Sequence, residues 1–152
     1  MKICLCILGK NENKYIKDFI ENYKNYRVDK IILYDNNDIN GEKFEEIIGD
    51  YIKQEFVHIE NWRGMEKMQF NIMNDCYKNN FDKFNWLIFY DIDEFIFLKI
   101  YTNIKEINQN LVNVELNWIH RVNEKLIYYD NRPLIERFKE KEFNIINKNM
   151  NF

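Results

Sequence analysis

Residues 84–95 read Phe84-Asn85-Trp86-Leu87-Ile88-Phe89-Tyr90-Asp91-Ile92-Asp93-Glu94-Phe95. The first six residues are apolar enough to form a buried strand, yet three acids follow almost at once. A carboxylate is costly to desolvate unless it is paired or bound to a cation. Asp91 and Asp93 are two residues apart, so on an extended backbone they point to the same side and can converge on one ion, while Glu94 should point away. We therefore favour a divalent-cation site at this strand end over an exposed turn.

This strand is the last of four apolar runs that alternate with helical patterns. Strands are predicted at residues 3–8, 30–34, 56–59 and 86–90. Amphipathic helices are predicted around residues 15–23, with Asn11 or Asn13 as the cap, and around residues 44–51 and 65–77. Strands that alternate with helices predict an α/β fold, with a mostly parallel central sheet flanked by helices.

The second half of the chain has weaker patterns. We expect a short strand at residues 95–98, a short helix at 103–111, a strand at 112–118 and a last helix that starts at Pro133. Residues 139–152 are rich in Asn and Lys and have few apolar anchors. The chain is therefore predicted to form one domain over residues 1–138, followed by a weakly ordered tail over residues 139–152.

Composition narrows the class of protein. The chain has 152 residues, is 46% hydrophobic and carries a formal charge of -3, which suits one globular domain and offers no broad basic surface for a nucleic acid. Cys4, Cys6 and Cys76 lie in apolar patterns without metal-site spacing, so we expect reduced core cysteines in a cytoplasmic protein. No apolar stretch approaches 18 residues, so no membrane span is expected, although peripheral association with the inner membrane face is compatible with the sequence.

Polar clusters follow three of the predicted strands. They are Lys10-Asn11-Glu12, Asp35-Asn36-Asn37 and Asp91-Ile92-Asp93-Glu94. In open parallel sheets, ligands bind beyond the carboxyl ends of the strands, so these clusters are expected to share one site. Capping of the first helix is the alternative for the first cluster, and ordinary turn chemistry is the alternative for the second.

Four further side chains are weaker candidates for this site. Arg63 and Gln69 follow Trp62 near a predicted helix start, where they could meet a phosphate or a sugar or simply lie at a solvated helix end. His120 could approach a metal ion, whereas His58 has the setting of a structural histidine. Trp118 is the best candidate among the tryptophans to stack on a sugar face, although core packing is the usual role.

Taken together, these blocks resemble the motif series of the glycosyltransferase family 92 and family 2-like group, which has a Rossmann-like GT-A fold. The blocks are Lys10-Asn11-Glu12, Tyr34-Asp35-Asn36-Asn37, Gln69, Trp86, Asp91-Ile92-Asp93-Glu94-Phe95, Trp118 and Arg132-Pro133-Leu134-Ile135-Glu136-Arg137-Phe138. The resemblance implies a nucleotide-sugar donor, usually a UDP-sugar, and a Mn²⁺ or Mg²⁺ ion. By matching position, Asp35 would contact the base, Asp91 the ribose or the metal, and Asp93 the metal. The first block would line the donor pocket.

The sequence therefore predicts a metal-dependent glycosyltransferase that moves a sugar to a glycan or glycolipid acceptor. The resemblance identifies no catalytic base, and Glu136 and Glu124 are weak candidates for that role. In the related group the chain normally continues well past the block that corresponds to residues 132–138, whereas this sequence stops at Phe152. A shortened, non-catalytic nucleotide-binding fragment is one alternative. A sugar nucleotidyltransferase is another alternative. It would be expected to carry a basic or glycine-rich triphosphate-binding loop after the first strand, and Gly9-Lys10-Asn11 matches that pattern only in part.

Overall fold

The computed structural model describes residues 1–96, 103–106, 121–122 and 140–141. The chain divides into two compact units, Met1–Gln109 and Asn110–Phe152, which are treated separately here. The predicted boundary at residue 138 lies outside the described residues. The same is true of the expected strand at residues 112–118 and of the expected helix that starts at Pro133.

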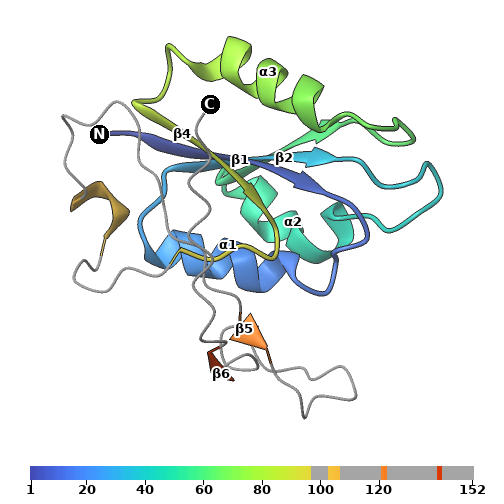
Figure 1. The fold of residues 1–152 in the computed structure, drawn as a ribbon, viewed down its shortest axis with the longest axis horizontal. Helices are drawn as coiled ribbons and strands as arrows, with labels where there is room; N and C mark the ends of the chain where they lie inside the picture. Colours follow the sequence, from blue (N-terminus) through green and yellow to red (C-terminus); the bar gives the residue numbers. More distant parts are fainter. Residues whose placement is uncertain (97–102, 107–120, 123–139, 142–152) are drawn as a thin grey trace. The chain divides into compact units, whose positions relative to one another are not determined.

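The first unit alternates strands and helices in the predicted order (Figure 1). The elements are β1 (Ile3–Gly9), α1 (Ile16–Asn25), β2 (Lys30–Asp35), α2 (Glu45–Lys53), β3 (Val57–Asn61), α3 (Gln69–Asn80) and β4 (Trp86–Asp91). The four strands form one sheet in the order β3-β2-β1-β4, and every neighbouring pair is parallel. The predicted α/β class, with a Rossmann-like parallel sheet, is confirmed.

Helices cover both faces of this sheet, with α1 and α2 on one side and α3 on the other (Figure 1). Alternation along β1 explains the division, because successive side chains of a strand point to opposite faces. Ile3, Leu5 and Ile7 join the core beneath α1 and α2. Cys4 and Cys6 join the smaller core beneath α3. A core on each face fixes the register of the strands and therefore the positions of their ends.

The smaller core holds a covalent link that the sequence analysis did not expect. Cys6 of β1 is bonded to Cys76 of α3, whereas Cys4 is free and buried. The prediction of three reduced cysteines is therefore wrong for two of them. Their separation by 70 residues hid the pairing, because only the packing of α3 on β1 brings the two sulfur atoms together. Disulfides persist mainly in oxidising compartments, so the bond does not support the argument for a cytoplasmic location that was based on reduced cysteines. The location stays a prediction.

Strand β4 is less buried than its sequence indicates. Residues Trp86 to Tyr90 are half-buried, and among the described residues β4 pairs with β1 alone. After it, Phe95 and Ile96 have no regular structure, and residues 97–98 of the expected strand lie outside the described residues. Of the helix expected at residues 103–111, the structure describes residues 103–106, which contain the 3₁₀ turn η1 (Ile104–Glu106). None of the described helices is long and apolar enough to cross a membrane.

The second unit contains one described feature. Strands β5 (Arg121–Val122) and β6 (Glu140–Lys141) form an antiparallel pair, in which Arg121 lies opposite Lys141. Strand β6 falls within the tail predicted over residues 139–152.

Candidate active site at the strand ends

The parallel sheet brings the three predicted polar clusters to one edge. In the register of the strands, Gly9 at the end of β1 lies opposite Asp35 at the end of β2. Leu8 lies opposite Asp91 at the end of β4, and Asp35 lies opposite Asn61 at the end of β3. The residues that follow these positions therefore leave the sheet at its carboxyl edge, where ligands bind in folds of this kind.

The acidic turn after β4 is anchored by the apolar residue between its aspartates. Ile92 is fully buried, whereas Asp91 and Asp93 on either side are exposed. A Cβ placed on Gly9 would lie 2.7 Å from Cδ1 of Ile92, so the glycine permits this close packing. The hydroxyl of Tyr23 on α1 donates to the carbonyl of Glu94 and accepts from the N–H of Ile96, which fixes the chain beyond the turn.

The position of Glu94 differs from the sequence expectation. The backbone turns after Asp91, so the alternation of an extended strand does not apply, and the carboxylate of Glu94 accepts the N–H of Asp91 at 3.3 Å. The N–H of Glu94 in turn donates to the carbonyl of Asp91 at 3.0 Å. All three acids of the turn thus stay near one another instead of separating to two faces.

A fourth carboxylate joins this acidic group from the end of β1. Burial, with a smaller contribution from the charges of Asp93, Asp91 and Glu42, raises the pKa of Glu12 from 4.5 to about 7. Burial and the charge of Asp93 likewise raise the pKa of Asp91. The pKa of Glu94 is raised by its burial and by the charges of the two aspartates. The shared electrostatic environment places Glu12 beside the acidic turn, as the predicted convergence of the first and third clusters requires.

This acidic group suits a divalent cation through its chemistry. Carboxylate oxygens are the ligands that Mg²⁺ and Mn²⁺ prefer, and Mg²⁺ commonly binds through one or two carboxylates together with substrate phosphates. In the described part of the chain, no three or more acidic, histidine or cysteine groups are arranged around one point as a complete metal cage. The carboxylates of Asp91, Asp93 and Glu12 are the groups at this edge whose chemistry suits ligands of such an ion.

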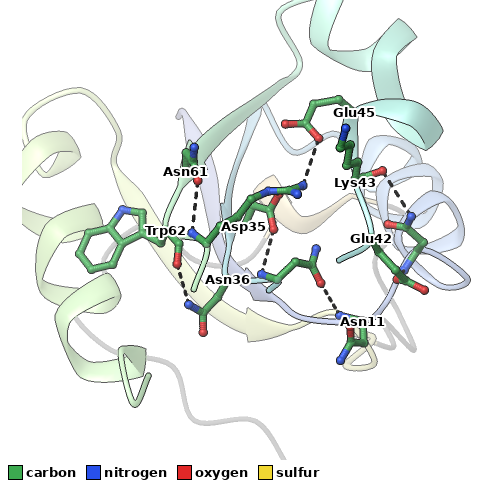
Figure 2. A network of polar contacts seen from close by, with 11 residues as sticks. Asn11, Asp35, Asn36, Glu42, Lys43, Glu45, Asn61 and Trp62 are labelled. Carbon is green, nitrogen blue, oxygen red and sulfur yellow. Dashed lines mark hydrogen bonds and ion pairs between the residues drawn. The ribbon is translucent and has the colours of Figure 1, made fainter. Parts of the chain in front are cut away.

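The second half of the edge is a hydrogen-bonded network around Asp35 (Figure 2). The Asp35 side chain is 1% exposed, and its Oδ2 lies 2.7 Å from Nε and 2.5 Å from Nη2 of Arg63. Its Oδ1 accepts the N–H of Asn37 at 3.0 Å. The Oδ1 of Asn37 accepts the N–H of Asn11 at 2.7 Å, which connects the ends of β1 and β2. The network therefore holds the first two predicted clusters together.

The loops after β2 and β3 are also joined to each other. The amide of Asn36 donates to the carbonyls of Trp62 and Met65, both at 2.8 Å, and Figure 2 shows Asn36 and Trp62 in this contact. The N–H of Gly64 donates to the carbonyl of Asn37. Arg63 lies in a turn and not at a helix start, and its side chain is 14% exposed. The structure thus places Arg63 as the partner of Asp35.

The sequence predicted that Asn11 or Asn13 caps α1, but neither residue does so. The N-cap is Tyr15, which makes no side-chain capping bond, and the N–H groups of Tyr15 and Ile16 donate to the carbonyl of Glu12. Asn11 has a positive φ of 59°, and its N–H donates to Oδ1 of Asn37 at 2.7 Å. A backbone turn makes the helix start, and Asn11 instead serves the network at the sheet edge.

The remaining candidates are spread more widely. Lys10 forms an exposed ion pair with Asp38 at 3.1 Å. Gln69 is the exposed first residue of α3. The weaker candidates His120, Glu124 and Glu136, together with Trp118, lie outside the described residues.

Sequence reasoning missed two members of the network. Asn37 was quoted only as part of its block, but it is fully buried and links Asn11 to Asp35. Glu45 on α2 lies 3.5 Å from Nη2 of Arg63 and was not considered. Asn37 lies two residues beyond the end of the buried strand β2, which was a usable signal, whereas nothing in the local pattern marks Glu45.

Comparison with known proteins gives this arrangement a family. The model of glycosyltransferase family 92 matches residues 1–152, the whole chain. The chain belongs to glycosyltransferase family 92. No curated protein and no solved structure matches it. Membership of family 92 confirms the resemblance drawn from the strand-end blocks and makes the protein a glycosyltransferase, with a sugar donor and an acceptor as substrates.

Proposed function

We propose that this family 92 protein transfers a sugar from a nucleotide-sugar donor, of the UDP class, in a reaction that depends on Mn²⁺ or Mg²⁺. The observation that carries the proposal is that the charges of Asp91 and Asp93 raise the pKa of Glu12, and that of Asp93 raises the pKa of Asp91, at the same sheet edge as Asp35. Buried or clustered acids that repel one another gain most from a bound cation. The acceptor in this proposal is a hydroxyl of a glycan or glycolipid.

In this proposal Asp93, together with Asp91, would hold the cation. A bound divalent ion neutralises the negative charge that develops on a departing nucleoside diphosphate. The turn after β4 keeps both carboxylates at the surface because Ile92 is buried between them. In the same proposal, Glu12, Lys10 and Asn11 would line the donor side of this edge.

Asp35 has a separate role in the proposal, as the group that orients the nucleoside. Its carboxylate is held by Arg63 and by the N–H of Asn37, so it is fixed before any ligand arrives. Preorganised polar groups lose little entropy on binding and so favour affinity. Arg63 therefore acts on the donor through Asp35 and not as a free phosphate-binding cation.

A thermal-shift panel of nucleoside diphosphates and UDP-sugars, with and without Mn²⁺, tests this assignment. A ligand that binds only the native state raises the melting temperature by mass action. We expect a rise with UDP and its sugars that requires the cation, and we expect Asp93→Ala to abolish the cation-dependent part. Asp82→Ala removes an exposed acid just beyond α3 and serves as the control. An unchanged Mn²⁺-dependent shift in Asp93→Ala would show that the metal assignment is wrong.

A further inference from the structure

A groove runs along the α3 face of the sheet, over the two strands that lie farther from α3. We call it the β2–β3 groove. It has a volume of about 430 Å³ and is lined by Lys30, Ile32, Tyr34, His58, Glu60, Asn79, Asn80, Lys83 and Phe84. The strand residues are two apart on each strand, so alternation places them all on one face. None of the candidate donor or metal residues lines this groove.

The position of α3 leaves the groove open. The helix packs on β1 and β4, and it reaches β2 through the hydroxyl of Tyr34, which donates to Asp75 at 2.7 Å. On β3, the side chains of His58 and Glu60 are 56% and 44% exposed, and Asn79 and Asn80 at the end of α3 form the opposite wall of the groove. A volume of this size lies in the range of about 300–1,000 Å³ that is typical of small-molecule sites.

The groups in the groove carry a positive balance. Lys30 and Lys83 contribute two ammonium groups, against the single carboxylate of Glu60. That carboxylate already lies 3.0 Å from Nε2 of His58, and the ammonium of Lys30 donates one bond to the carbonyl of Glu55. Within the part of the chain that the structure describes, no partner is found for the side chains of Lys83 and Asn79. Both can therefore donate to a ligand without first breaking a bond.

We propose that the β2–β3 groove binds a saccharide that carries a carboxylate or a phosphate group. Lys83 would donate to the oxyanion in a charge-assisted hydrogen bond. The amide of Asn79 can exchange hydrogen bonds with sugar hydroxyls, and Phe84 supplies an apolar surface for a ring face. The inference does not depend on the proposed donor site, because the two sets of residues do not overlap.

Isothermal titration of the full chain, with nucleotide and divalent cations absent, tests the proposal. The probes are glucuronate, glucose 6-phosphate, glucose and inorganic phosphate. We expect at least one acidic sugar to bind, and to bind about tenfold or more tightly than glucose, since hydrogen bonds to charged groups are the stronger ones. Which acidic sugar binds better distinguishes a carboxylate from a phosphate as the anionic group.

Two substitutions with opposite expected signs locate the site. Lys83→Gln removes a cation and should weaken acidic-sugar binding about tenfold, whereas Glu60→Gln removes the opposing carboxylate and should strengthen it. Lys78→Gln changes an exposed lysine of α3 that does not line the groove, and it should leave affinity unchanged. Both Lys83 and Glu60 have solvent-accessible side chains, so folding is expected to survive either change.

Three results would overturn the proposal. One is the absence of acidic-sugar binding at millimolar concentration. Another is affinity for inorganic phosphate equal to that for the sugars, which would leave the saccharide without a role. The third is an equal loss in Lys83→Gln and Lys78→Gln, which would reflect general surface charge. Loss of donor binding in Asp93→Ala bears on the donor site alone, so failure of one proposal is distinguishable from failure of the other.

Discussion

The guanidinium of Arg63 lies against the carboxylate of Asp35, with Nε at 2.7 Å and Nη2 at 2.5 Å from the same oxygen. The Asp35 side chain is 1% exposed, and the two residues are 28 positions apart in the chain. Together they join the end of β2 to the loop after β3. A buried ion pair of this kind contributes little relative to an apolar pair, but loss of one partner leaves an uncompensated charge.

We therefore expect Arg63→Gln to destabilise the protein by about 3–5 kcal/mol, because the carboxylate of Asp35 would stay buried without its cation. Urea denaturation monitored by circular dichroism measures the change. Asp35→Asn combined with Arg63→Gln should recover part of the loss, since it removes the orphaned charge. The control is Lys53→Gln, which breaks an exposed pair with Asp50 and should leave stability unchanged. A cost for Arg63→Gln no larger than the control would contradict the buried pair.

Glu12 predicts a pH dependence of stability in the absence of divalent cations. Its pKa rises from an ordinary 4.5 to about 7 in the folded state, mainly through burial. Between these values the folded state binds more protons than the unfolded state, so the free energy of unfolding falls as the pH rises from 4.5 to 7. Stability from this group is fully present below pH 4.5 and is lost through pH 7.

Glu12→Gln should therefore flatten the decline in stability over this window, as measured by denaturation at a series of pH values. The slope should not vanish, because the pKa values of Asp91 and Glu94 are raised as well. Glu46→Gln alters an exposed acid of α2 and should keep the wild-type slope. If Glu12→Gln and Glu46→Gln gave the same profile, Glu12 would not be the group with the raised pKa.

The Cys6–Cys76 bond predicts a stability that depends on redox conditions. It joins residues 70 positions apart. Closing a loop of this length lowers the entropy of the unfolded chain and so raises the free energy of unfolding by about 4 kcal/mol. Dithiothreitol should lower the midpoint of urea unfolding in the wild type, and Cys76→Ser should show the lower midpoint without it. Cys4→Ala, which alters the free cysteine, should retain the response to reductant. Alkylation of three thiols in the unreduced, denatured protein would rule out the bond.

Gly9 predicts a steric effect beneath the acidic turn. A Cβ at this position would lie 2.6 Å from Cζ of Phe44 and 2.7 Å from Cδ1 of Ile92, closer than carbon atoms can approach. Gly9→Ala should cost about 1–3 kcal/mol through overpacking and should weaken Mn²⁺-dependent nucleotide binding by displacing Ile92. Gly49→Ala, which has open space around the new methyl group, should instead raise stability by about 0.5–1 kcal/mol. Equal effects of the two substitutions would exclude this packing constraint.

Much of the fold could be predicted from local pattern. The apolar runs that end near Leu8, Tyr34 and Tyr90 form β1, β2 and β4, with bounds that shift by one residue. A buried strand can be predicted in this way because its core residues are consecutive in the sequence. Gly9 and the acids after Tyr90 marked the carboxyl edge in the same way. The start of α1 was less predictable, since a backbone turn at Glu12 replaced the expected asparagine cap.

The candidate site was predictable in its outline but not in its pairings. Asp91 and Asp93 were identified from the cost of acids beside a buried strand, whereas the structure has β4 half-buried and both aspartates exposed. The bond of Glu94 back to Asp91 was not foreseen, because it depends on the turn that the backbone makes after β4. Roles in donor and metal binding for these residues stay predictions until ligands are tested.

The sequence by itself determined the order of strands and helices, the placement of polar residues at the strand ends and the membership of family 92, because each is recorded in neighbouring residues or in motif order. The tertiary structure decided that Arg63 neutralises Asp35 and that Cys6, and not Cys4, meets Cys76. These contacts join segments far apart in the chain. Their partners are chosen by helix packing and loop paths, which depend on the whole core and not on any local pattern.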